Sequence, residues 1–152
     1  MAHHAHHHGH GKPSAIATSA QATLHCLTGC AIGEVAGLAI GVGLGLGVWP
    51  TIVLATLLAY ASGFTLGVLP VMRAQATTFW KVLKIIWIGE AVSIGVMEVV
   101  MNAVDYQMGG MNSGSILSWM FVRGLLFAIP AGFLVAWPVN YWLIKRELKA
   151  CH

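Results

Sequence analysis

Four long apolar stretches, separated by short polar or glycine-rich connections, dominate the chain. They cover residues 24–48, 50–72, 82–105 and 116–144. Each is long enough to supply the about 20 mostly apolar residues that a membrane-spanning helix requires. The pattern therefore predicts an all-α fold, an integral membrane bundle of four transmembrane helices.

The composition agrees with this pattern and excludes an ordinary soluble domain. Of 152 residues, 57% are hydrophobic and only 9% are charged, whereas soluble domains carry about 25% charged residues. We expect a His-rich flexible tail over residues 1–23, the transmembrane domain over 24–145, and a C-terminal tail over 146–152 that ends in Cys-His. The four spans leave no room for a catalytic domain, so we do not expect an enzyme.

The distribution of basic residues predicts the orientation in the bilayer. In a four-span arrangement seven of the Lys and Arg residues fall on one side, and the two loops on the other side contain none. These residues are Lys12, Arg73, Lys81, Lys84, Lys145, Arg146 and Lys149. The positive-inside rule then places both termini in the cytoplasm of a bacterial cell, with the protein in the inner membrane. The net charge of +3 is thus a topology signal, and no nucleic-acid partner is expected.

Glycines recur at every fourth position of the first stretch, at Gly29, Gly33, Gly37, Gly41 and Gly45. Small residues at this spacing let two helix backbones approach closely in lipid. We expect the stripe to serve helix packing, either inside the bundle or at the seam of a homo-oligomer.

The same stretch opens with side chains that can bind metal. Cys26, Cys30 and Glu34 follow one another at a spacing of four, which places them on one face of a helix, and His25 lies beside them. Thiolates select Cu(I) or Zn, and a reducing cytoplasm would keep the thiols free. The alternative is that the cysteines act as small apolar core residues.

Acidic and sulfur side chains share one sector of the third stretch: Glu90, Met97, Glu98, Met101 and Asp105. Ionisable groups at membrane depth are costly and should face the bundle interior. Thioethers bind Cu(I) without deprotonation, so Met97 and Met101 are candidate ligands, although methionine also fills core gaps.

Two groupings follow from the expected depths of these residues in the membrane. Arg123 should lie level with Glu98 and form an ion pair with it, either structural or part of a proton path that includes Asp105. Glu90 should lie level with Cys30 and Glu34 and share a site with them. The C-terminal Cys151 and His152 would add further ligands at the cytoplasmic face.

Part of the sequence resembles a known family. The run 22–34, ATLHCLTGCAIGE, the stretch 92–98, VSIGVME, and Pro138-Val139-Asn140 are similar to bacterial membrane proteins grouped as domain of unknown function 4396. The resemblance covers most of residues 20–145. It implies a four-span membrane domain, often with a His-rich tail, and it implies no activity.

The residues favour binding and transport of a transition-metal ion, Cu(I) first, with Zn, Ni or Fe as other candidates. One alternative is a membrane metallochaperone or assembly factor that exchanges metal with a donor or acceptor protein. Another is a redox, quinone or haem protein, although the three residues between Cys26 and Cys30 differ from the two of a redox pair. The last is a scaffold whose polar residues are all structural.

Overall fold

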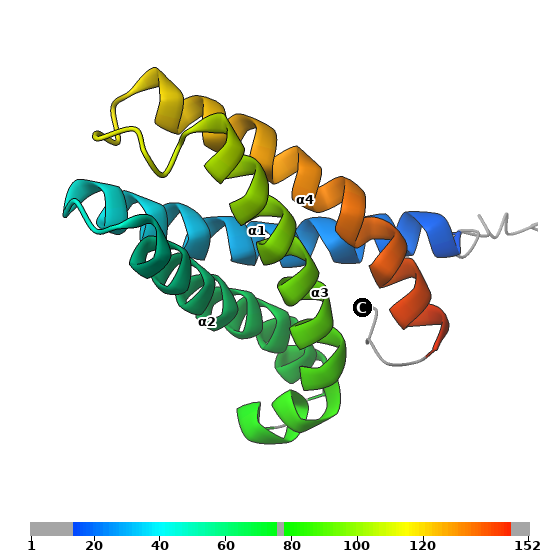
Figure 1. Ribbon diagram of the computed structural model, residues 1–152. Coiled ribbons are helices and arrows are strands. Elements are labelled where there is room, and N and C mark those ends of the chain that lie inside the picture. The colour runs from blue at the N-terminus through cyan, green and yellow to red at the C-terminus, as the bar shows by residue number, and fades with distance from the viewer. Residues whose placement is uncertain (1–13, 76–77, 147–152) are drawn as a thin grey trace, which may run out of the picture.

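Four helices joined by short connections make up the protein (Figure 1). The computed structural model describes residues 14–75 and 78–146, without the side chains of residues 70, 71, 74 and 75, and this part of the chain contains no strand. The helices are α1 (Ala15–Gly43), α2 (Val48–Gln75), α3 (Phe79–Met108) and α4 (Trp119–Lys145). The predicted all-α fold of four helices is confirmed.

Helix α1 begins at Ala15, well before the expected start at Leu24. Ser14 caps it, because its hydroxyl oxygen accepts a hydrogen bond from the backbone N–H of Ala17 at 3.2 Å. The first two turns are small and polar, which made them look like a tail, but Ser19 in the second turn is fully buried. Only residues 1–13 of the expected N-terminal tail lie outside the described part.

The glycine stripe of α1 packs against α2. A Cβ atom on Gly33 would collide with the backbone of Leu58 and Ala59, and one on Gly37 would collide with the backbone of Ala55. Gly29 and Gly41 are equally close to the same helix. The stripe is therefore used within the bundle and does not offer an open oligomer seam.

Gly45, the last member of the expected stripe, is not part of this packing. It follows the end of α1, its φ of +64° is left-handed, and no atom lies within 4 Å of the position a Cβ would take. Glycine serves the turn between α1 and α2 here, because other residues rarely adopt that backbone conformation. The spacing of four continued past the helix end by coincidence.

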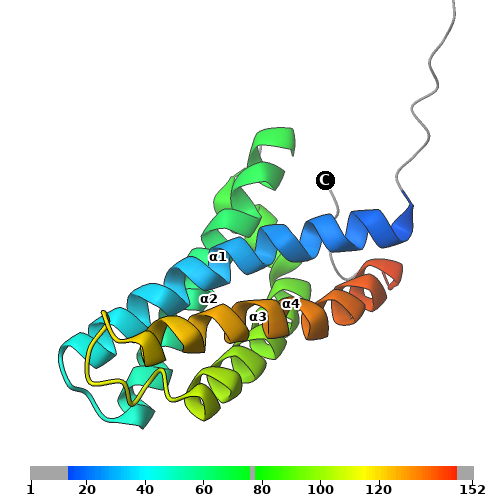
Figure 2. The same ribbon diagram turned by 90° about the horizontal axis from the view of Figure 1, so that it is seen from above.

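The helices form an up-and-down bundle in which α1 and α3 each contact the three other helices. Within the described residues, α2 and α4 do not touch each other. The α1–α2 turn and the α3–α4 loop lie at one end of the bundle, here called the turn end (Figures 1 and 2). The α2–α3 connection and the outer ends of α1 and α4 lie at the opposite end, the link end, where the pairs α1/α4 and α2/α3 diverge.

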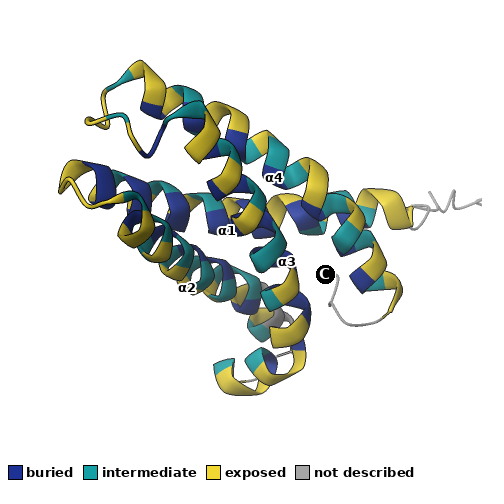
Figure 3. Ribbon diagram, in the orientation of Figure 1, coloured by how far each residue is buried: buried dark blue, intermediate teal, exposed yellow. Residues whose placement is uncertain are grey.

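The core has three clusters of buried apolar side chains along this axis. Figure 3 colours the buried positions of the ribbon dark blue. The central cluster joins α1, α2, α3 and α4 and contains Ile94 and Ala128. The turn-end cluster includes Leu38 and Phe121. The third cluster holds only α2 and α3 together, through Val68 and Val82 among others. The α1/α4 pair has no cluster of its own among the described residues of the link end, where hydrogen bonds between polar side chains join the two helices.

The outer surface is suited to lipid. Helix α1, the segment Val48–Leu69 of α2 and helix α4 are each long and apolar enough to cross a membrane. Large apolar side chains point outward from several helices, including Leu57, Val99 and Leu126, which are 63%, 71% and 60% exposed. An apolar surface of this extent is unfavourable in water but is normal in a bilayer. The chain is a membrane protein.

Exposed tryptophans mark both ends of the bundle. Trp49 and Trp119 lie in the first turns of α2 and α4, at the turn end. Trp80 and Trp142 lie at the link end, in α3 and α4. Such amphipathic rings are typical of the two membrane–water interfaces. The four tryptophans are thus divided between the two ends of the bundle, as an aromatic belt at each membrane surface requires.

Candidate functional site

Four sulfur side chains belong to the buried core at the centre of the bundle. Cys26 and Cys30 come from α1, and Met97 and Met101 come from α3. All four belong to the central buried cluster, and Cys30, Met97 and Met101 have no exposed surface. Neither Cys26 nor Cys30 forms a disulfide. Each pair is spaced by four residues, so each helix contributes two sulfurs in successive turns of one face.

We call Cys26, Cys30, Met97 and Met101 the sulfur cluster. Small and polar residues surround it. A Cβ atom on Gly132 of α4 would lie only 2.6 Å from Cγ of Met101, and one on Gly63 of α2 would lie 3.3 Å from Sγ of Cys30. Sγ of Cys26 lies 3.6 Å from the hydroxyl oxygen of Ser93. The cluster is thus enclosed by all four helices, and one of its thiols contacts a hydroxyl.

Three carboxyl groups are buried beside the sulfur cluster and on its turn-end side. Glu34 and Asp105 have no exposed surface, and Glu98 is 2% exposed. Glu98 accepts a hydrogen bond from the Asn102 amide at 3.3 Å, whereas neither carboxyl oxygen of Glu34 has a hydrogen-bond partner among the described residues. Glu34 interacts electrostatically with Glu98 and Asp105. The interior therefore contains a set of acidic groups next to soft ligands.

The expected ion pair between Glu98 and Arg123 does not form. The Arg123 guanidinium donates instead to the backbone carbonyl oxygen of Met108 at 2.8 Å. Gly124, the next residue, lies against Asp105, so Arg123 is level with the last turn of α3. Glu98 lies about two helical turns deeper. The prediction was wrong because α4 begins at Trp119 and not at Ile116, which leaves Arg123 closer to the helix start.

His25 and Glu90 each contact α2. Nε2 of His25 lies 3.0 Å from the carbonyl oxygen of Leu66, and the ring is exposed. The Glu90 carboxyl lies next to Gly67 of α2. Within residues 14–75 and 78–146, no group of three or more His, Cys, Asp or Glu side chains is placed to hold a metal ion.

The expected grouping of Glu90 with Cys30 and Glu34 is therefore not formed as one ligand set. Glu90 does interact electrostatically with Cys30, but the acidic neighbours of Glu34 are Glu98 and Asp105. The remaining candidate ligands, Cys151 and His152, lie outside the described residues.

Pairs of polar side chains between α1 and α4 continue the polar interior toward the link end. The Trp137 indole N–H donates to the Ser19 hydroxyl at 3.0 Å. The Asn140 amide donates to the Thr23 hydroxyl at 2.9 Å, and both side chains are fully buried. Reasoning from the sequence did not find these pairs, although Ser19 and Thr23 show the same spacing of four as Cys26 and Cys30.

These groups together form what we call the polar column. It runs from Ser19 and Thr23 near the link end, through the sulfur cluster with Ser93, to Glu98, Glu34 and Asp105 near the turn end. Burying so many polar groups at membrane depth is costly. Buried polar groups at this depth are the starting point for a functional hypothesis.

Comparison with known proteins gives one match. The family model of the Domain of unknown function (DUF4396) matches residues 17–149. The chain belongs to this family. Neither the curated proteins nor the solved structures contain a match. The matched region of this DUF4396 protein covers all four helices and both halves of the sulfur cluster, but the family carries no assigned activity, so the function has to be argued from the residues.

Proposed function

We propose that this DUF4396 protein binds Cu(I) at the sulfur cluster and carries it across the membrane. The observation that supports this most is that two thiols of α1 and two thioethers of α3 belong to one buried cluster in the core of the bundle. Soft sulfur ligands favour Cu(I) among biological metal ions, and a buried site in a membrane protein can exclude competing hard ions. The protons of the cysteines would leave when the ion binds.

The ligand types favour Cu(I) over the other metal ions considered. Thiolates also bind Zn and iron–sulfur clusters, but Zn sites complete their coordination with Cys, His or carboxylate ligands and not with thioethers. His25 faces α2, and the described residues contain no cluster of three His, Cys, Asp or Glu side chains suited to a metal. Methionine is a ligand for Cu(I) in particular, so Met97 and Met101 raise the selectivity of the cluster for that ion.

The polar column supports transport over storage or hand-over at one face. It extends from the sulfur cluster in both directions, toward Thr23 and Asn140 on one side and toward Glu98 and Asp105 on the other. A protein that only delivered metal at the cytoplasmic face would need no polar groups near the turn end. Met111, buried in the turn-end cluster, offers a further thioether beyond the acids.

Exchanging the two methionines for leucine tests the proposed path. We expect Met97→Leu/Met101→Leu to lower the Cu(I) affinity and the rate of Cu(I) entry into proteoliposomes by roughly 10- to 100-fold, because ligating and supporting groups of a metal site each contribute about this much. Leucine has nearly the same volume as methionine, so the helices should still pack. The measurement is copper uptake into vesicles under reducing conditions.

Met120→Leu is the matched control, since this methionine lies on α4 and is 41% exposed. It should leave uptake unchanged. If the double variant Met97→Leu/Met101→Leu still binds Cu(I) but no longer takes it up into vesicles, the result would still fit a path through the methionines. Uptake at the wild-type rate in the double variant would contradict the proposal.

We also propose that α3 crosses the membrane as a fourth span. Its outward face is apolar, with Ile85, Ile88, Val92 and Val99 exposed, while Glu98 and Asp105 point into the bundle. Its 30 residues match the lengths of α1, α2 and α4. Charged groups that face the interior of a bundle are compatible with a spanning helix.

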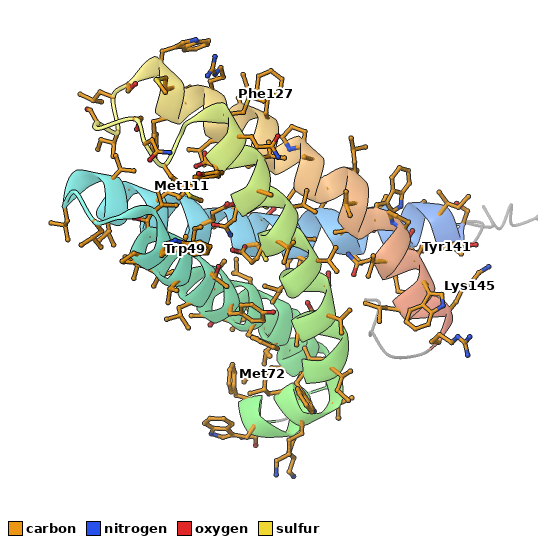
Figure 4. All side chains as sticks on the ribbon, in the orientation of Figure 1. Trp49, Met72, Met111, Phe127, Tyr141 and Lys145 are labelled. Carbon is orange, nitrogen blue, oxygen red and sulfur yellow. The ribbon has the colours of Figure 1, made fainter. Side chains whose placement is uncertain are left out.

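With four spans, the link end faces the cytoplasm of a bacterial cell, and the protein lies in its inner membrane. Arg73, Lys81, Lys84, Lys145 and Arg146 all belong to the link end. Lys145 projects from the end of α4 beside Tyr141 (Figure 4), with Nζ 4.6 Å from the ring centroid. Arg123 is the single basic residue near the turn end among the described residues, and it lies inside a helix. The positive-inside rule then orients the bundle.

Thiol labelling can test this orientation, because Cys26 and Cys30 are buried. A membrane-impermeant maleimide added to inside-out vesicles should label Cys151, and the same reagent added to right-side-out vesicles should not. Cys151→Ser should abolish the signal in the inside-out vesicles. Labelling from the outer side of right-side-out vesicles would reverse the proposed orientation.

A further inference from the structure

An aromatic groove lies between α2 and α3 on the side of the bundle that faces the lipid. It has a volume of about 630 Å³. Tyr60 and Phe64 line it from α2, and Phe79, Trp80 and Trp87 line it from α3. We call it the aromatic groove below. Its size falls within the about 300–1,000 Å³ of small-molecule sites, and its lining is almost entirely apolar.

Contacts within the structure hold the groove open. The Tyr60 hydroxyl donates to the backbone carbonyl oxygen of Ala91 at 3.1 Å, which fixes α2 against α3 along the groove. The Tyr60 and Phe64 rings are 6.0 Å apart, and the Phe79 and Trp80 rings meet edge to face at 5.6 Å. The buried cluster of Val68, Val82 and others supports the same two helices. The groove is therefore preformed by packing on both sides.

One charged side chain lines the groove, and it is basic. Lys84 contributes to the lining, and Lys81 lies one turn earlier on the same side of α3. Both are exposed. No carboxylate is among the lining residues, because the acidic side chains Glu90 and Glu98 of α3 point into the bundle. The groove thus combines a long apolar wall with a positive charge near the membrane surface.

We propose that the aromatic groove binds an anionic phospholipid, with an acyl chain along the aromatic side chains and the phosphate on Lys84. An opening to the lipid phase selects a lipid over a water-soluble ligand. Basic pockets between transmembrane helices are typical sites for anionic head groups. The flanking tryptophans are suited to the head-group region. This inference depends on the membrane location and not on copper.

A lipid competition experiment tests the proposal. Detergent-purified full-length protein, stripped of lipid, is incubated with equal amounts of phosphatidylglycerol and phosphatidylcholine, and the bound lipid is measured by native mass spectrometry. We expect phosphatidylglycerol to be retained about fivefold over phosphatidylcholine, since one lysine near a membrane surface contributes about this factor. Lys84→Gln should remove this preference, and Lys84→Arg should keep it.

Two further variants separate the groove from general surface charge. Lys145→Gln makes the same charge change at the end of α4, away from the groove, and should leave the preference intact. Ala61→Trp adds a ring to the groove lining, where Ala61 is exposed, and should lower the retention of both lipids. Circular dichroism checks that each variant keeps its helices.

Three results would overturn the proposal: equal retention of the two lipids, an unchanged preference in Lys84→Gln, or unchanged retention in Ala61→Trp. Displacement of the phospholipid by an equal amount of an uncharged quinone or isoprenoid would also overturn it. Binding would then depend on the apolar wall of the groove alone and not on the charge of Lys84.

Discussion

Changing Cys26 and Cys30 together to serine is expected to remove copper from the protein. A serine hydroxyl is a hard, protonated oxygen and a poor ligand for Cu(I), whereas a thiolate is a soft one. The two remaining thioethers, Met97 and Met101, are neutral and should hold the ion far more weakly. We expect the copper content to fall from near one ion per chain to background, and the affinity to fall by roughly 100-fold or more, given the about 10- to 100-fold effect of a single supporting group.

The measurement is elemental analysis of protein purified in detergent after loading with Cu(I) under reducing conditions. Residues 1–12 must be removed first from every variant, because six of them are histidines that bind metal from any buffer. Cys151→Ser in the same truncated background is the matched control, since it removes the third cysteine of the chain. It should keep its copper.

The structure of the double variant should be close to the wild type, so the loss can be assigned to the ligands. Serine is slightly smaller than cysteine, and the Ser93 hydroxyl near Cys26 can accept or donate to a new hydroxyl. Copper retained at the wild-type level by Cys26→Ser/Cys30→Ser would exclude the sulfur cluster as the site. Absence of copper from the truncated parent protein would remove both the transport and the metal-delivery interpretations.

The sequence was sufficient to predict the features that depend on one helix alone. The spacing of four places Cys26 and Cys30, and likewise Met97 and Met101, on single faces, and all four side chains are buried together. The glycines from Gly29 to Gly41 could be recognised as a packing surface for the same reason. Helix periodicity carries this information without any knowledge of the partner helix.

Features that depend on how two helices are aligned could not be predicted. Thr23 and Asn140 are separated by more than a hundred residues, and nothing local indicates that they form a hydrogen bond. The start of α4 set the depth of Arg123, so a shift of about one turn removed its expected partner. His25 is next to Cys26 in sequence, but successive side chains differ by about 100° around a helix, and the ring faces α2 instead.

The second prediction with a large expected effect concerns the close packing of Gly33 of α1 against α2. Gly33→Ala is expected to lower the free energy of unfolding by about 1–3 kcal/mol, the range for forcing extra atoms into a packed site. The added methyl group would meet the backbone of Leu58 and Ala59, which cannot rotate away as a side chain could. To accommodate it, α1 and α2 must separate, and every close contact along the stripe weakens with them. The measurement is unfolding in mixed detergent micelles, followed by circular dichroism.

Gly43→Ala is the matched control, because it makes the same change near the end of the same helix where no atom lies within 4 Å of the new methyl group. It should alter stability by no more than about 0.5 kcal/mol. Separation of α1 from α2 would also shift Cys30, whose sulfur lies beside Gly63 of α2. Copper affinity should therefore fall in Gly33→Ala and remain unchanged in Gly43→Ala. Equal stability of the two variants would mean that the glycine stripe does not set the distance between the helices, and the sulfur cluster would then need another explanation for its placement.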